Sequence, residues 1–208
     1  MSHRILCIML IAVMVIVAGC ALSPANAPST TTETSDWRQR LAAAHGYDQF
    51  DQVLEVQFTF NVARGDKTTS RRWGWQPIQS GVVLNGEVSY FRDLIEQSTQ
   101  AAKDADRMFI NDSFWLMMPL HLMWDDGIAI EDMGTARLPI GEGTGRHLIV
   151  RYPDTGGYTP GDRYDLYLDD NDHITQWAFH KGGSDEPTLI TTWEDYQQIG
   201  PLWFSLHR

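Results

Sequence analysis

An alternation of apolar and polar residues with a period of two recurs along this chain and constrains its fold more than any other sequence feature. In residues 54–62 every second side chain is apolar, and the side chains between them are polar. Successive side chains of a strand point to opposite faces of a sheet, so this segment is predicted to be a strand with one dry face. Eight further segments have similar patterning: residues 68–76, 81–84, 87–92, 128–138, 147–152, 163–168, 173–181 and 188–194.

Clusters of turn-forming residues separate these segments, as expected for consecutive hairpins. They are Arg64-Gly65-Asp66, Asn85-Gly86, residues 154–157 and residues 169–172. Asn85-Gly86 is the strongest hairpin signal, because both central residues of a type I′ turn need a positive φ. The strands are therefore predicted to form an antiparallel meander.

Few segments have helical periodicity. Residues 36–45 predict one short helix, and residues 93–107 predict a second, opened by a capping pair of acidic residues. Residues 109–120 carry more apolar bulk than a surface helix can hide. We expect a short helix or irregular segment there, which plugs an interior and ends at Pro119. The fold class expected from the residues is mainly β with a few helices (α+β).

The N-terminus combines a 13-residue apolar stretch, residues 5–17, with the motif Val17-Ala18-Gly19-Cys20. This motif resembles the processing site of bacterial lipoproteins. The resemblance implies that residues 1–19 are a signal peptide and that Cys20 is the lipidated mature terminus. Two or three acyl chains would anchor the protein firmly, since each buried methylene contributes about 0.8 kcal/mol.

The alternative is a transmembrane anchor, because residues 5–22 form an uncharged run that just reaches spanning length. The small residues before Cys20 and the lack of a basic cluster after Leu22 favour the lipoprotein. Ala21, which follows the cysteine, implies by resemblance to Gram-negative lipoproteins that the protein is sorted to the outer membrane. We therefore expect it in the cell envelope, lipid-anchored and facing the periplasm.

Composition separates a tether from a single domain and excludes several classes of function. Residues 20–35 are rich in Pro, Ser, Thr and Ala and predict a flexible tether, which leaves residues 36–208 as one domain. The only cysteines are Cys7 and Cys20, so the domain has no thiol for a disulfide, a metal site or nucleophilic catalysis. A formal net charge of −11 disfavours nucleic acid as a partner.

The order of these elements resembles the lipoprotein-carrier superfamily, which includes the periplasmic carrier and the outer-membrane receptor of the Lol lipoprotein-sorting pathway. Two segments resemble uncharacterised bacterial lipoproteins of this type: residues 111–119, and Ile174-Thr175-Gln176-Trp177 with Trp193-Glu194-Asp195-Tyr196 after it. The resemblance implies a curved antiparallel sheet that forms an open half-barrel over two or three helices. It also implies an apolar cavity that takes acyl chains.

Aromatic and methionine side chains are the candidates for lining such a cavity, because they present adaptable, polarisable surface. The alternative is that they fill an ordinary core. The expected function is binding or transfer of a lipid or other amphiphile, without covalent chemistry. The candidate ligand-binding residues are Phe58, Phe60, Trp73, Trp75, Phe114, Trp115, Met117, Met118, Trp177 and Phe179.

Two other classes of function remain open: a small periplasmic hydrolase, and a structural or assembly lipoprotein that holds a partner protein. His121 and Asp125 have the spacing of two metal ligands on a helix, but we expect no metal site and no cofactor. Residues 169–172 offer oxygen ligands for calcium, yet a solvated hairpin turn is favoured because an EF-hand loop is absent. Arg71-Arg72 could meet a lipid head group, but the wet face of a strand is favoured.

Overall fold

The computed structural model describes residues 31–157 and 160–208 of this chain. Strands account for 43% and helices for 28%, and the strands pair in antiparallel sheets. The expected mainly β fold, with curved antiparallel sheet and helices, is confirmed. The signal peptide, Cys20 and residues 20–30 of the tether lie outside the described residues and stay predictions. Within the described part of the chain, no helix has the length and apolar character needed to cross a membrane.

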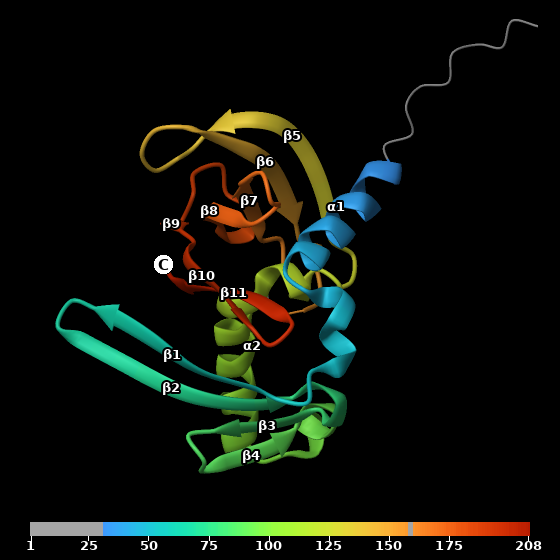
Figure 1. The fold of residues 1–208 in the computed structure, drawn as a ribbon. Helices are drawn as coiled ribbons and strands as arrows, with labels where there is room; N and C mark the ends of the chain where they lie inside the picture. The colour runs from blue at the N-terminus through green and yellow to red at the C-terminus, as the bar shows by residue number, and fades with distance from the viewer. Residues whose placement is uncertain (1–30, 158–159) are drawn as a thin grey trace, which may run out of the picture.

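The strands are divided among three sheets (Figure 1). The four-stranded sheet has the order β1-β2-β3-β4, the five-stranded sheet the order β5-β6-β7-β8-β9, and β10 pairs with β11. Their bounds are β1 Val56–Arg64, β2 Lys67–Gln76, β3 Gly81–Leu84, β4 Val88–Phe91, β5 Ala129–Arg137, β6 Thr144–Arg151, β7 Arg163–Leu168, β8 Ile174–His180, β9 Leu189–Thr192, β10 Glu194–Ile199 and β11 Leu202–His207. Each strand pairs with its neighbour in the chain, so the predicted meander is present within each sheet.

Two α-helices organise the sheets, α1 (Thr31–Ala44) and α2 (Gln100–His121). Short 3-10 helices lie at Tyr47–Gln52, Pro77–Gln79, Arg92–Gln97 and Lys181–Gly183. In Figure 1, α2 runs between the four-stranded sheet and the five-stranded sheet, and α1 packs beside β5. The indole nitrogen of Trp37 in α1 donates to Asp132 of β5 at 3.1 Å, which fixes this contact.

The interior consists of two hydrophobic cores that share α2. The first, which we call the five-strand core, contains Phe114 and Met118 of α2 together with inward residues of β5 to β8. The second, the four-strand core, contains Phe109, Met117 and Leu120 of α2 together with residues of β1 to β4 and β11. One helix therefore closes both cores.

The start of α2 differs from the sequence prediction. Asp93 and Glu96 lie in a separate 3-10 helix, Arg92–Gln97, rather than at the start of the long helix. The cap is instead Thr99, whose hydroxyl oxygen accepts a hydrogen bond from the Ala102 N–H at 3.2 Å. Threonine and aspartate both accept this bond, so the local sequence does not show whether the long helix starts at Asp93 or at Thr99.

The end of α2 also differs, because the helix continues past Pro119 to His121. A proline inside a helix has no N–H for the carbonyl four residues earlier, which here belongs to Trp115. The guanidinium of Arg208 donates to that carbonyl instead. The backbone bends at Met117, whose φ of −139° is not helical. The kink at Met117 and the hydrogen bond from Arg208 together let the helix accommodate Pro119.

Smaller departures concern the ends of elements. The first helix begins at Thr31, not Asp36. The first strand begins at Val56, and Leu54 is 77% exposed rather than on a dry face. Phe58 and Phe60 are only partly buried against the four-strand core. The hairpin of β10 and β11 was not predicted.

A buried ion pair joins β2 to α2 and corrects the expectation for Arg71. Its guanidinium makes two hydrogen bonds to Asp112, with Nε–Oδ2 at 2.6 Å and Nη2–Oδ1 at 2.7 Å. The indole nitrogen of Trp73 donates to the same carboxylate at 2.9 Å. Arg71 thus shares the inner face of β2 with Trp73, whereas Arg72 is exposed on the outer face.

Candidate functional site

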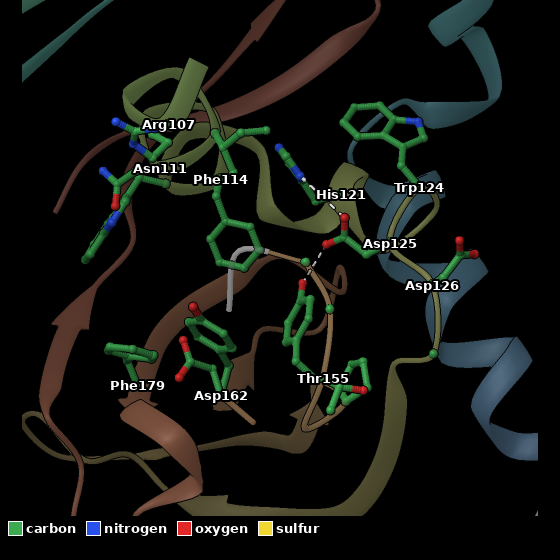
Figure 2. Close-up of a pocket in the computed structure, with 18 of the residues that line it drawn as sticks. Arg107, Asn111, Phe114, His121, Trp124, Asp125, Asp126, Thr155, Asp162 and Phe179 are labelled. Carbon is green, nitrogen blue, oxygen red and sulfur yellow. Dashed lines mark hydrogen bonds and ion pairs between the residues drawn. The ribbon is translucent and has the colours of Figure 1, made fainter. Parts of the chain in front are cut away.

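A cavity of about 870 Å³ lies among the C-terminal half of α2, the loop that follows it and strands β7 and β8 (Figure 2). Its size falls in the range of small-molecule sites, roughly 300–1,000 Å³. The lining combines aromatic rings with a few charged side chains. This is the combination expected for a site that buries an apolar ligand and orients its polar end.

Five aromatic side chains form what we call the aromatic wall: Phe114, Tyr152, Tyr164, Trp177 and Phe179. The ring of Tyr164 lies centrally, with centroids 5.2 Å from Phe114, 5.0 Å from Phe179, 5.1 Å from Trp177 and 5.9 Å from Tyr152. The pairing of β7 with β8 explains this arrangement. Tyr164 is opposite Phe179, and Leu166 is opposite Trp177, so period-two alternation turns these side chains to the same face.

The predicted ligand residues divide into two groups. Four of them line the cavity: Phe114, Trp115, Trp177 and Phe179. The other six do not line it. Trp73, Trp75 and Met117 are buried in the four-strand core, Met118 is buried in the five-strand core, and Phe58 and Phe60 lie partly buried beside the four-strand core. The structure does not bring the ten together, because α2 separates the two cores.

Two carboxyl groups line the cavity beside the aromatic wall, those of Asp125 and Asp162. The Tyr152 hydroxyl donates to Asp125 Oδ2 at 2.8 Å, and the Gly182 N–H donates to Asp162 Oδ1 at 2.7 Å. Burial raises the pKa of Asp125 above its ordinary value. Burial and the neighbouring Asp125 raise the pKa of Tyr152 as well, so its hydroxyl keeps its proton and remains a donor at neutral pH.

His121 lies between Ser113 and Asp125, in an arrangement that superficially matches a Ser-His-Asp triad. Its Nε2 is 3.3 Å from the Ser113 hydroxyl, and its Nδ1 is 4.0 Å from Asp125 Oδ1. The Ser113 hydroxyl has one proton and two acceptors within reach, the Ile110 carbonyl at 3.2 Å and His121 Nε2 at 3.3 Å, so it is not committed to the histidine. A triad also needs Nδ1 to donate a hydrogen bond to the carboxylate, and the 4.0 Å between Nδ1 and Asp125 Oδ1 is too long for one.

The burial of Ser113 and His121 gives two further arguments against catalysis. Ser113 is 2% exposed and does not line the cavity, so a substrate held there would not reach its hydroxyl. Burial also lowers the pKa of His121 to about 3, well below the value of a working general base. Ser113 and His121 thus form a buried polar pair that supports the end of α2, whereas Asp125 faces the cavity.

Arginines at the cavity are already occupied by acidic neighbours. Arg92 donates from Nε to Asp106 Oδ1 at 3.0 Å, and Arg107 pairs with Asp104. Figure 2 shows Arg107 and Asn111 on the opposite side of the cavity from Asp125 and Asp126, and the Asp126 carboxylate is directed away from Phe114. The positive charges that line the cavity are therefore largely balanced by their own partners.

Metal ligation finds no support among residues 31–157 and 160–208, where no group of three or more His, Cys, Asp or Glu side chains is arranged to hold an ion. At the predicted turn, Asp169 Oδ1 accepts hydrogen bonds from the N–H groups of Asn171 and His173. Asp172 forms a two-point ion pair with Arg40 of α1. These carboxylates stabilise the turn and dock α1.

One polar group at the cavity has no partner. Trp177 is almost fully buried and lines the cavity, and its indole N–H makes no hydrogen bond within the described chain. A buried donor without an acceptor costs about 1–3 kcal/mol. The nitrogen atom itself is inaccessible, so this cost belongs to the packing of the five-strand core.

The sequence prediction missed Tyr152, Tyr164 and Asp162. Tyr164 could be identified from the sequence, because the alternation of residues 163–168 places it on the same face as Leu166 and Leu168. Tyr152 could also be found from the sequence, because it ends the alternating segment 147–152 on the same face as Leu148 and Val150. Asp162 lies just before β7, outside any alternating segment, so no periodic signal marks it. The sequence suggests Asp125 only as a possible metal ligand, together with His121.

Comparison with protein-family models gave no match, and neither a curated protein sequence nor a solved structure matches this chain. The resemblance to the lipoprotein-carrier superfamily therefore stays a prediction from the sequence.

Proposed function

We propose that this protein binds an amphiphile non-covalently in the cavity, while its N-terminal acyl chains hold it in the cell envelope. The observation that carries the proposal is the volume of about 870 Å³ lined by the aromatic wall and Trp115. Each methylene buried there contributes about 0.8 kcal/mol, so ten methylenes contribute about 8 kcal/mol before the costs of association.

The hydrolase alternative loses support from the same geometry. The best acid–base arrangement at the cavity, Ser113 with His121 and Asp125, lacks a hydrogen bond between the imidazole and the carboxylate and has an inaccessible hydroxyl. Binding without turnover accounts for the side chains that do face the cavity.

Replacing Trp115 with alanine is expected to weaken binding of the neutral apolar probe 1-N-phenylnaphthylamine by about tenfold, with a small effect on stability. Trp115 is only partly buried, and its ring contacts Trp177 at a centroid distance of 4.8 Å, so its loss enlarges the cavity without opening the centre of a core. A tenfold weakening corresponds to about 1.4 kcal/mol of binding free energy. The cost in free energy of unfolding is expected to be smaller than that of truncating a fully packed tryptophan. Probe fluorescence titration of the chain from Ala21 onwards, which keeps every described residue, provides the measurement.

The matched control is Trp203→Ala. Trp203 is also partly buried and contacts the ring of His173, but it does not line the cavity. This variant is expected to bind the probe like the wild type. Equal losses in the two variants, or no binding by the wild type, would contradict the proposal.

Replacing Cys20 with serine is expected to release the protein from the membrane or to leave it as an unprocessed precursor. The physical reason is that serine lacks the thiol to which the acyl chains would be attached. Membrane fractionation and intact-mass measurement report both outcomes. Processing and membrane association equal to the wild type would exclude lipidation at Cys20.

A further inference from the structure

The charges around the cavity indicate which kind of head group the ligand carries; this step rests on the proposed function. We propose that the ligand is a cationic amphiphile, with an amine or quaternary ammonium group held between Asp125, Asp162 and the aromatic wall. Figure 2 shows Asp125 and Asp162 at different positions around Phe114, and both residues belong to the lining of the cavity.

The first argument is the balance of charge. The lining contains Asp125, Asp126 and Asp162, against Arg92 and Arg107. Both arginines are already engaged, Arg92 with the buried carboxylate of Asp106 and Arg107 with Asp104. Neither Asp125 nor Asp162 has an ion pair with Lys or Arg among the described residues; each accepts a hydrogen bond from a neutral donor. Arg38 and Arg92 act on the Asp125 carboxyl through their charge, but neither pairs with it directly, so both carboxyl groups keep an open position for a cationic ligand.

The second argument is the aromatic wall. The electron-rich face of an aromatic ring attracts a cation within about 6 Å of its centroid, and cages of such rings recognise quaternary ammonium groups. Here five rings meet with successive centroids 5.0–6.1 Å apart, around the same space that Asp125 and Asp162 border. An ammonium group in the cavity would lie beside the rings that line it.

The third argument concerns the anionic alternative. A fatty-acid carboxylate would approach two carboxyl groups of the same sign, which disfavours it. The whole chain, with a formal net charge of −11, also attracts cations and repels anions before contact. The site is thereby selective against the commonest anionic amphiphiles.

The test compares three ligands with the same ten-carbon chain: decyltrimethylammonium, decanol and decanoate. Each displaces the neutral probe from the chain from Ala21 onwards at pH 7.5 and low salt. The cation is expected to bind at least tenfold more tightly than decanoate, with decanol between them. In the double variant Asp125→Asn with Asp162→Asn, the ratio of cation affinity to anion affinity is expected to fall to about threefold or less.

Both substitutions preserve an acceptor oxygen for the donors that Tyr152 and Gly182 provide, so the fold is expected to persist. The control is the double variant Asp170→Asn with Asp185→Asn, which removes the same two units of charge from exposed positions outside the cavity and is expected to keep the wild-type ratio. If decanol and decanoate bind as tightly as the cation, the head-group inference is overturned while binding stands. If none of the three ligands displaces the probe, and the probe itself does not bind, the proposed function fails as well.

Discussion

Replacing Asp112 with alanine is expected to lower the free energy of unfolding by about 3–5 kcal/mol, the range for breaking one side of a buried ion pair. The Asp112 carboxylate is fully buried and accepts two bonds from Arg71 and one from Trp73. Its removal leaves the largely buried guanidinium without its counter-charge and the Trp73 N–H without an acceptor. Urea denaturation of wild type and variant gives the difference directly.

Two variants separate the buried charge from general damage to α2. Asp104→Ala removes an exposed partner of Arg107 from the same helix and is expected to cost less than about 1 kcal/mol. The double variant Arg71→Met with Asp112→Leu replaces the pair by apolar side chains and is expected to recover much of the lost stability. A cost for Asp112→Ala no larger than that for Asp104→Ala would show that the ion pair is not a structural link.

Acidification is expected to destabilise the protein from about pH 6.5 downward, through two buried histidines. Burial lowers the pKa of His121 to about 3 and that of His45 to about 4. In the unfolded chain both histidines take up a proton near pH 6.5, whereas in the native protein they stay neutral. Stability is therefore fully present above pH 6.5 and falls by about 1.4 kcal/mol per pH unit for each histidine, or about 3 kcal/mol each by pH 4.

Asp125 acts with the opposite sign. Its folded-state pKa is raised, so its ionisation costs stability at neutral pH, and protonation on acidification removes this cost. The histidines dominate because there are two of them and both are almost fully buried. Urea titrations at pH 7, 6, 5 and 4 measure the slope. His121→Gln is expected to reduce it by about half, and the exposed His207→Gln is expected to leave it unchanged. A wild-type slope near zero would contradict the burial of neutral imidazoles.

Strands could be predicted from this sequence wherever alternation was strong. Gly81–Leu84 and Arg163–Leu168 have the bounds that the pattern predicts. The sequence did not predict β10, whose residues are Glu-Asp-Tyr-Gln-Gln-Ile. Only Tyr196 is partly buried, so the strand has no apolar face that alternation could reveal. In β11 the alternation of Leu202 and Phe204 was present but short.

Features that depend on distant contacts could not be predicted. Nothing near Pro119 shows that Arg208, 89 residues later, supplies the hydrogen bond that the proline cannot make. The cavity posed the same problem. Alternation shows that Trp73 and Trp177 both face inward, but only the position of α2 shows that they face different cores.

The position of α2 has a consequence for how the molecule unfolds. A free helix of 22 residues with a kink is marginal in water, so α2 depends on contacts from both sides. Loss of either core removes contacts that keep α2 helical, and the other core needs the same helix. The two β regions are therefore expected to unfold as one cooperative unit. If a ligand binds against Phe114 as proposed, we expect it to protect backbone amides as far away as β2, through the shared helix and without touching that sheet.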